Sequence, residues 1–231
     1  MVSKIAVIGA NGKVATQLVQ KLANLKTEFE TIAFIRDSSQ GSKFDQLGIK
    51  YSTKIDIIES NLEKIANTLK GFDAVVFSAG AGGKGLDKTF AVDLDGAVKV
   101  SEAVKLAKVK RFLLVSALKS QDREFWWNTP LRSYFIAKKY ADEIISRDED
   151  LNWTILQPGH LKDENDTGKI EDPLRVNSIA NKISKENHDI SIPRSDVAQA
   201  IIESLRNEST IKKFIPLIRG EIDIKEAIGK I

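Results

Sequence analysis

The hydrophobic residues of this chain gather in short runs that alternate with amphipathic stretches. Six runs read as buried strands, and they cover 4–9, 31–36, 49–55, 73–80, 111–117 and 152–159. Between them, apolar residues recur every three or four positions, which predicts helices over 12–25, 61–71, 86–107 and 131–146, with a short polar helix before residue 49. This alternation predicts an α/β fold, a doubly wound parallel sheet with helices on both faces.

The pattern loosens after residue 160. The stretch 163–173 is polar and rich in turn residues. A helix is expected over 195–207 with Ser195 or Asp196 near its N-cap, followed by a strand within 212–220 and a terminal helix over 223–231. Because no flexible linker or internal repeat is evident, we expect a single domain over 1–231, with a small lobe from about residue 160.

Composition narrows the possible chemistry. The 231 residues are 42% hydrophobic and 29% charged, with a net charge of +3, which suits a globular protein and gives no reason to expect nucleic acid as a partner. The chain has no cysteine, and its two histidines, His160 and His188, belong to no metal-ligand motif, so no metal site is expected. No apolar run could cross a bilayer, so we expect a cytoplasmic protein with no membrane contact.

A glycine turn follows the first predicted strand. Gly9, Gly12 and Ala15 form the pattern G-x-x-G-x-x-A where that strand meets a helix. Glycine lets the backbone turn sharply and approach a pyrophosphate, and the N–H groups of a helix start favour an anion. The turn predicts dinucleotide binding by Gly9, Asn11, Gly12, Lys13 and Val14, and the alternative is a purely structural turn.

The end of the second strand bears on which dinucleotide is bound. Sites for NAD usually have an acidic residue there against the ribose hydroxyls. Here Arg36 comes first and Asp37 follows. Arginine can hold a 2′-phosphate through two charge-assisted hydrogen bonds, and Ser38 can add a donor. The order favours NADP (as NADPH). In the alternative, Arg36 is a solvated loop residue and Asp37 contacts the ribose of NAD.

Other strand ends should meet at the same edge of the sheet, where ligands of parallel sheets bind. We expect the cofactor site to include Asp56, Ile57, Ser78, Ala79, Gly80, Pro158 and Gly159. The stretch 78–85 is rich in glycine but does not match a P-loop, because Gly85 follows Lys84. Its small residues instead allow the sugar and phosphates of a cofactor to pass close to the backbone.

The helix 131–146 carries Tyr134 and Lys138, whose spacing of four places both side chains on one face. With Ser116 at the end of the fifth strand, the glycine turn and the stretch 157–159, this order of motifs resembles the short-chain dehydrogenase/reductase superfamily. The chain is most similar to compact atypical members, among them NmrA-like proteins and the biliverdin-IXβ/flavin reductase group. The resemblance covers about residues 4 to 220 and implies a Rossmann fold with NAD(P) as cofactor.

The resemblance also implies an active site. Ser116 corresponds to the serine that hydrogen-bonds the substrate carbonyl or hydroxyl, and Tyr134 to the general acid or base. Lys138 corresponds to the lysine that holds the nicotinamide ribose and lowers the pKa of the tyrosine. One departure is Asp93, which stands near the place of the family's asparagine. A proton relay through that asparagine is therefore not expected here.

Three functions are compatible with these motifs. The first is an NADPH-dependent reductase of a small carbonyl or conjugated compound, acting as a monomer or homodimer, with the residues after 160 as its substrate lobe. The second is a sensor of the NADP/NADPH ratio with little or no turnover, as in NmrA-like proteins. The third, a nucleotide-sugar epimerase or dehydratase, is disfavoured by the short C-terminal part.

An aromatic run interrupts the polar loop before Tyr134. Phe125, Trp126 and Trp127 are expected either to form the wall of a pocket for a flat substrate or to anchor the loop to the core or to a partner subunit. Anchoring is the favoured interpretation. His160, after Pro158 and Gly159, either faces the nicotinamide or is polar surface, and the second is favoured.

Overall fold

The computed structural model describes residues 2–183 and 189–231 and has a seven-stranded sheet at its centre. Its order is β10-β6-β5-β4-β1-β2-β3, and every pairing is parallel. The strands are β1 (Ser3–Ile8), β2 (Phe29–Phe34), β3 (Lys50–Ser52), β4 (Ala74–Phe77), β5 (Arg111–Val115), β6 (Trp153–Pro158) and β10 (Lys213–Leu217). The predicted doubly wound parallel sheet, a Rossmann-like fold, is confirmed.

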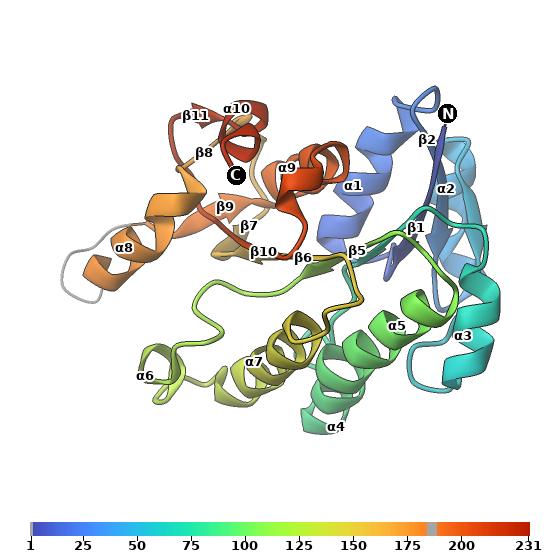
Figure 1. Cartoon of the computed structure of the whole chain (residues 1–231), viewed down its shortest axis with the longest axis horizontal. Coiled ribbons are helices and arrows are strands. Elements are labelled where there is room, and N and C mark those ends of the chain that lie inside the picture. The colour runs from blue at the N-terminus through green and yellow to red at the C-terminus, as the bar shows by residue number, and fades with distance from the viewer. Residues whose placement is uncertain (1, 184–188) are drawn as a thin grey trace.

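Helices cover both faces of this sheet (Figure 1). One layer holds α1 (Lys13–Ala23) and α9 (Arg194–Arg206), and α10 (Ile224–Gly229) packs beside α9. The other holds α3 (Leu62–Leu69), α5 (Asp95–Leu106) and α7 (Arg132–Ser146). Short helical turns, which lie in the connections, are Ser38–Gln40, α2 (Ser42–Gln46), α6 (Arg123–Trp126) and Glu208–Thr210.

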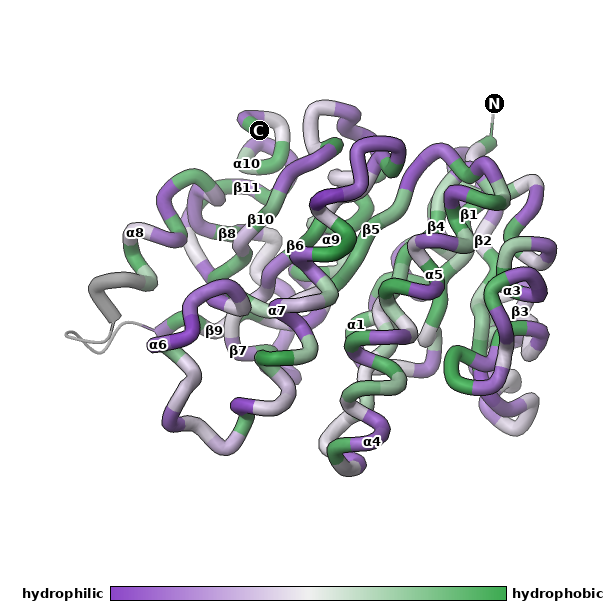
Figure 2. Tube along the Cα trace, turned by 60° about the horizontal axis from the view of Figure 1, so that its bottom comes forward, coloured by the Kyte–Doolittle hydropathy of each residue, from purple (hydrophilic) through white to green (hydrophobic). Residues whose placement is uncertain are grey.

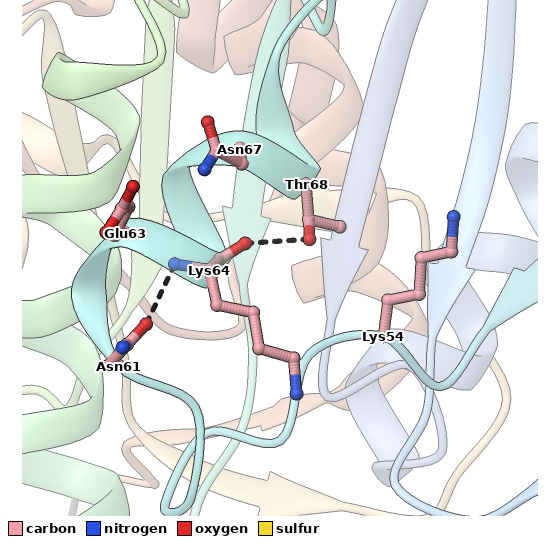
Figure 3. Close-up of a pocket in the computed structure, with 6 residues that line it drawn as sticks. All are labelled: Lys54, Asn61, Glu63, Lys64, Asn67 and Thr68. Atoms are coloured by element: carbon pink, nitrogen blue, oxygen red, sulfur yellow. Dashed lines mark hydrogen bonds between the residues drawn. The ribbon is translucent and has the colours of Figure 1, made fainter.

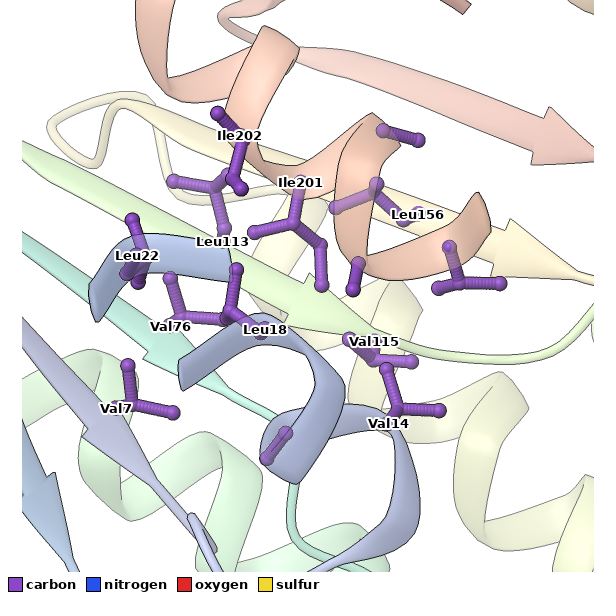
Figure 4. Packing of buried hydrophobic residues seen from close by; sticks show 14 of the residues in the cluster. Val7, Val14, Leu18, Leu22, Val76, Leu113, Val115, Leu156, Ile201 and Ile202 are labelled. Atoms are coloured by element: carbon purple, nitrogen blue, oxygen red, sulfur yellow. The ribbon is translucent and has the colours of Figure 1, made fainter. Parts of the chain in front are cut away.

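Alternation along the strands divides the core into two layers. Ile5 and Val7 pack toward α1 and α9, whereas Ala6 and Ile8 belong to the cluster under α3, α5 and α7. Figure 4 shows Val7 with side chains of α1 and α9 in the first of these layers. The tube coloured by hydropathy shows hydrophobic strands between helices that mix both kinds of residue (Figure 2). Because neither face of the sheet meets water, its strands read as continuous apolar runs.

Strand order reverses between β1 and β4, which marks the switch point of the sheet. Gly9 follows β1 with a φ of 77°. A Cβ atom at Gly9 would lie 2.7 Å from the Cα of Ala79, just after β4. Glycine is therefore required for conformation and for space, and the close approach joins the two loops at the switch point.

The C-terminal part differs from the expected lobe. β10 and α9 belong to the main sheet and its helical layer, because Ile215 and Leu217 are buried beside β6 and the apolar face of α9 packs on α1. The other elements were not predicted, since each is short and lacks a clear period. They are β7 (His160–Lys162) paired with β9 (Ser191–Pro193), β8 (Lys169–Ile170) paired with β11 (Ile222–Asp223), and α8 (Pro173–Ile183).

Two helix predictions are corrected. The helix expected over 86–107 consists of α4 (Leu86–Lys88), a π-helical segment (Thr89–Leu94) and α5. The wider turn changes which side chains face inward, and Asp93 is buried there. The N-cap of α9 is Pro193, not Ser195 or Asp196. The Asp196 carboxylate instead accepts hydrogen bonds from the Thr167 hydroxyl (2.7 Å) and the Gly168 N–H (3.0 Å), which ties the polar loop to α9.

Candidate functional site

A cavity of about 300 Å³ opens at the carboxyl ends of β1, β2 and β4, beside the switch point. Nine residues expected to contact the cofactor line it: Gly9, Asn11, Gly12, Arg36, Asp56, Ile57, Ser78, Ala79 and Gly80. Its lining also includes three further residues of the stretch 78–85, Ala81, Gly82 and Lys84, and seven residues that were not foreseen: Ile8, Phe34, Ile35, Gln40, Ile55, Ile58 and Val92. The cavity therefore has a largely apolar floor with polar and cationic groups around it.

The glycine turn forms one wall. The Gly12 N–H donates to the Gly9 carbonyl (2.8 Å), and Gly12 is the N-cap of α1 with no side chain to cap it. Two neighbours point elsewhere and are not among the lining residues. Val14 is buried in the core, and the Lys13 ammonium is 2.5 Å from the Asp163 carboxylate.

Arg36 and Asp37 differ in their placement. Arg36 is exposed and lines the cavity. Asp37 is not part of the lining, and its carboxylate accepts the Ser39 N–H (2.8 Å) at the start of the short turn that contains Ser38. That hydrogen bond holds the pKa of Asp37 below its ordinary value. The Asp37 carboxylate is thus engaged with its own loop.

Asp56 is the acidic residue among the lining residues. Its carboxylate accepts the N–H groups of Ile58 (2.8 Å) and Glu59 (3.0 Å). Asp56 therefore shapes the loop after β3, and part of its hydrogen-bonding capacity is already used there.

A buried ion pair lies next to the cavity. The Lys138 ammonium is 3.3 Å from the Asp93 carboxylate, with side-chain exposures of 4% and 2%, and it donates to the Val115 carbonyl (3.2 Å). The second carboxylate oxygen of Asp93 accepts the N–H of Ala81 (2.9 Å), a lining residue. Asp93 therefore connects the predicted catalytic lysine to the cavity wall. The sequence had marked Asp93 only as a departure from the family.

Tyr134 lies beside this pair, with the Lys138 ammonium 5.6 Å from its ring centroid. Burial raises the pKa of Tyr134; the Lys138 ammonium opposes this rise, and the carboxylates of Asp93 and Asp142 reinforce it. Burial disfavours the charge on Lys138, but Tyr134, Asp93 and Asp142 together keep the pKa of Lys138 above its ordinary value. The net shift of Tyr134 is opposite to that implied by the resemblance. The phenol of Tyr134 therefore holds its proton more tightly than that of a free tyrosine.

Ser116 makes a hydrogen bond that was not foreseen. Its hydroxyl donates to the Asp142 carboxylate (2.8 Å), which also accepts the Ser120 hydroxyl (2.8 Å) and the Gln157 amide (3.3 Å). Asp142 is fully buried on α7, one turn beyond Lys138. Its spacing of four from Lys138 was a signal in the sequence, but an acidic residue at helical spacing is more often exposed.

The ionisation of Asp142 should affect stability. Burial raises the pKa of Asp142 against hydrogen bonds from Ser116 and Ser120, so the folded state holds this proton more tightly than the unfolded state. Stability should therefore fall as pH rises from about 4, the ordinary pKa of Asp, through the raised folded value. We expect Asp142→Asn to lack this fall. Urea denaturation of both proteins across this window checks it, and parallel curves would contradict it.

The remaining predicted cofactor residues also lie outside the cavity lining, and they are Ser38, Lys138, Pro158 and Gly159. The Pro158 carbonyl accepts the Leu118 N–H (2.9 Å), and the Gly159 N–H donates to the Leu217 carbonyl (2.9 Å). These bonds join the loop after β5 and the edge strand β10 to the end of β6. Pro158 and Gly159 are thus not part of the lining that includes the glycine turn.

The aromatic run has mixed placement. Trp126 is fully buried, stacks on Phe135 with ring centroids 6.1 Å apart, and donates to the Ser120 carbonyl (3.1 Å). Phe125 packs on the edge of Phe135, whereas Trp127 is exposed under the Arg132 guanidinium. Trp126 therefore anchors the loop to α7. His160 has an exposed side chain, and His188 lies outside the described residues.

A second hollow, on the outer side of α3, is lined by polar residues (Figure 3). The Asn61 side chain accepts the Lys64 N–H (2.9 Å), and the Thr68 hydroxyl donates to the Lys64 carbonyl (2.8 Å). Both hydrogen bonds go to the backbone of α3, so these side chains stabilise the helix. In the part of the chain that the structure describes, no cluster of acidic or histidine side chains could hold a metal ion. No helix in the same part is long and apolar enough to cross a membrane.

Comparisons with known proteins agree with this geometry. Residues 9–208 match the model of a family described as NAD(P)H-binding. The UPF0659 protein YMR090W of Saccharomyces cerevisiae is 42% identical over 228 residues, which is 97% of each chain. A putative NAD-dependent epimerase/dehydratase from Bacillus halodurans is 32% identical, with 99% of this chain and 100% of that chain covered and a TM-score of 0.85. The oxidoreductase ylbE from Lactococcus lactis is also 32% identical, with 99% and 96% covered and a TM-score of 0.82.

Proposed function

This chain belongs to the NAD(P)H-binding family, and on that premise we propose that it is an NADPH-dependent reductase of a small carbonyl or conjugated compound. The observation that carries the proposal is the buried pair of Asp93 and Lys138, which bonds to the cavity wall at Ala81 and places the Lys138 ammonium 5.6 Å from the ring centroid of Tyr134. A proton donor next to a cofactor site is what reduction by hydride transfer requires.

The cavity residues fit a dinucleotide. Backbone rather than side chains forms the wall where phosphates must approach closely, at Gly9, Gly12 and Gly80. A Cβ atom at Gly80 would lie 3.1 Å from the Asp93 carboxylate, and one at Gly12 would lie 3.1 Å from the Gly9 carbonyl. The N-terminus of α1 contributes its dipole to the same wall.

The charges around the cavity support NADPH. Arg36 and Lys84 both line it, while Asp37, the acid at the end of β2, points into its own turn. In this proposal Arg36 binds the 2′-phosphate, and the apolar side chains of Phe34 and Ile55 lie against the adenine.

The chemistry follows from the other half of the site. The bound dinucleotide supplies a hydride. Tyr134 donates a proton from its phenol to the developing oxyanion or carbanion of the substrate, and Lys138 stabilises the phenolate that remains. Ser116 at the end of β5 orients the substrate. Asp93 keeps Lys138 charged and holds it near Val115.

A sensor of the NADP/NADPH ratio is the second candidate. The ammonium of Lys138 is already bound by Asp93 and by the Val115 carbonyl. Lys138 must give up one of these partners to bind a cofactor ribose, and this favours a protein with little turnover. Different affinities for the oxidised and reduced cofactor, with no turnover on a broad carbonyl panel, would support the sensor. Retention of NAD through purification would instead support an epimerase or dehydratase, the name given to the Bacillus halodurans protein.

Calorimetric titration with NADP⁺, NADPH, NAD⁺ and NADH tests the proposal. We expect Arg36→Ala to weaken NADPH binding by about 10- to 100-fold and to leave NADH binding unchanged, because a hydrogen bond to a charged group contributes about 1.5–3 kcal/mol. Arg175→Ala, an exposed arginine on α8, is the matched control. A loss confined to Asp37→Ala would assign the ribose to Asp37 and NAD to the site. No binding of any of the four nucleotides would overturn both the reductase and the sensor.

A further inference from the structure

The two oxygens of the buried Asp142 carboxyl group have different surroundings. Oδ2 accepts from the hydroxyls of Ser116 and Ser120 (both 2.8 Å) and from the Gln157 amide (3.3 Å). Oδ1 is buried and has no hydrogen-bond partner among the described residues. An acidic residue that is fully buried with one bare oxygen is costly and calls for an explanation beyond packing.

No charged group forms a bond to the Oδ1 atom of Asp142 among the described residues. Lys138 lies one turn earlier on α7, but its ammonium is engaged by Asp93, from the π-helical segment, and by the Val115 carbonyl. Tyr134 is the other titratable group of α7 that couples to Asp142. From β5 and β6 only neutral groups, Ser116 and Gln157, face the carboxyl group.

The convergence on Oδ2 determines the direction of the Ser116 hydroxyl hydrogen. Four donors lie within hydrogen-bond distance of Oδ2, because the Gln121 amide (3.5 Å) joins those of Ser116, Ser120 and Gln157. The ionised carboxylate therefore receives its donors through Oδ2 and none through Oδ1 among the described residues. While Asp142 is ionised, Oδ2 can only accept from Ser116, because a carboxylate has no hydrogen to donate. The Ser116 hydrogen is committed to Asp142, and only the lone pairs of its oxygen remain for a ligand.

We propose that Asp142 is a positioning residue that makes Ser116 a hydrogen-bond acceptor, so that the site selects substrates with an O–H or N–H donor beside the carbon that is reduced. The carbonyl oxygen of a substrate without such a donor can accept a hydrogen bond from Tyr134 but not from Ser116. This inference rests on the proposed function, because it takes Ser116 as the residue that orients the substrate.

A matched pair of probes tests whether Ser116 accepts a hydrogen bond from the substrate. The probes are hydroxyacetone and its O-methyl ether, methoxyacetone, titrated calorimetrically into the NADP⁺-saturated protein. We expect the hydroxy ketone to bind about 3- to 10-fold more tightly to the wild type, the range of one neutral hydrogen bond. The preference in affinity does not depend on turnover. A failure of catalysis with the preference intact would count against the reductase alone.

Three variants separate positioning from packing. Asp142→Asn places an amide where its N–H₂ group can donate to Ser116, so the preference should disappear or reverse. Ser116→Ala should also abolish it while Asp142 stays in place, which keeps the test open if Asp142→Asn does not fold. Ser120→Ala removes the neighbouring hydroxyl and should retain the preference. Equal affinities in the wild type, binding of neither probe, or an unchanged preference in Asp142→Asn would overturn the proposal.

Discussion

Replacement of Tyr134 by phenylalanine is expected to lower turnover by about 10²- to 10⁴-fold, the usual contribution of a positioned general acid. The ring should keep its place, because it packs on the edge of Phe135 with centroids 5.5 Å apart and that contact does not involve the hydroxyl. NADPH affinity should therefore stay within a few-fold of the wild type. Steady-state NADPH oxidation, with the best substrate from a carbonyl and conjugated-compound panel, together with calorimetric titration, measures both quantities.

A matched control is available on the same helix. Tyr140 is 40% exposed, and its hydroxyl bonds to the Arg123 guanidinium (2.9 Å) on the surface. Tyr140→Phe should leave turnover unchanged. If Tyr134→Phe also left it unchanged, Tyr134 would have no part in the chemistry. If the wild type itself showed no turnover but bound both forms of the cofactor with different affinities, the sensor would be the better explanation.

Asp93→Asn is expected to destabilise the protein by about 3–5 kcal/mol, the usual cost of removing one partner of a buried ion pair. The substitution keeps a side-chain oxygen that can accept the Ala81 N–H, so the loss isolates the charge that faces Lys138. Because native domains are stable by only about 5–15 kcal/mol, the change should be evident in urea denaturation.

Asp95→Asn provides the comparison two residues away. Asp95 is 69% exposed and pairs with Lys99 at 3.6 Å, and solvent-exposed pairs of this kind contribute at most about 0.5 kcal/mol. A loss of that small size for Asp93→Asn as well would mean that the charge of Asp93 contributes little to keeping Lys138 buried. The proposed route from the cavity wall through Asp93 to Tyr134 would then lose its main support.

The sequence was most informative about the sheet and the cavity. Strands buried on both faces must be apolar throughout, and this requirement made six of the seven strands of the main sheet recognisable in order. The seventh, β10, was recognised as a strand but was not expected at the edge of the main sheet, because an isolated strand gives no indication of which neighbour it pairs with. Nine expected lining residues were found together, since the ends of parallel strands meet at one edge.

Long-range contacts were beyond the reach of local patterns. The bond from Ser116 to Asp142 spans 26 positions, and that from Ala81 to Asp93 spans 12. Whether a charged residue faces water or a partner depends on the packing of helices against the sheet, and in the case of Asp93 on a π-helical turn. The spacing of hydrophobic residues in the sequence does not predict a π-helical turn.

Local periodicity and glycine placement by themselves determined the fold class and the position of the dinucleotide cavity, because each follows from short-range rules of backbone and burial. The family resemblance needed the order of the motifs as well, including Ser116, Tyr134 and Lys138. Only the tertiary structure decided the electrostatics of the site. It paired Lys138 with Asp93, raised the pKa of Tyr134 through burial and turned the Ser116 hydroxyl toward Asp142. The physical reason is that desolvation and hydrogen-bond direction depend on groups from separate elements, which come together only when the chain is folded.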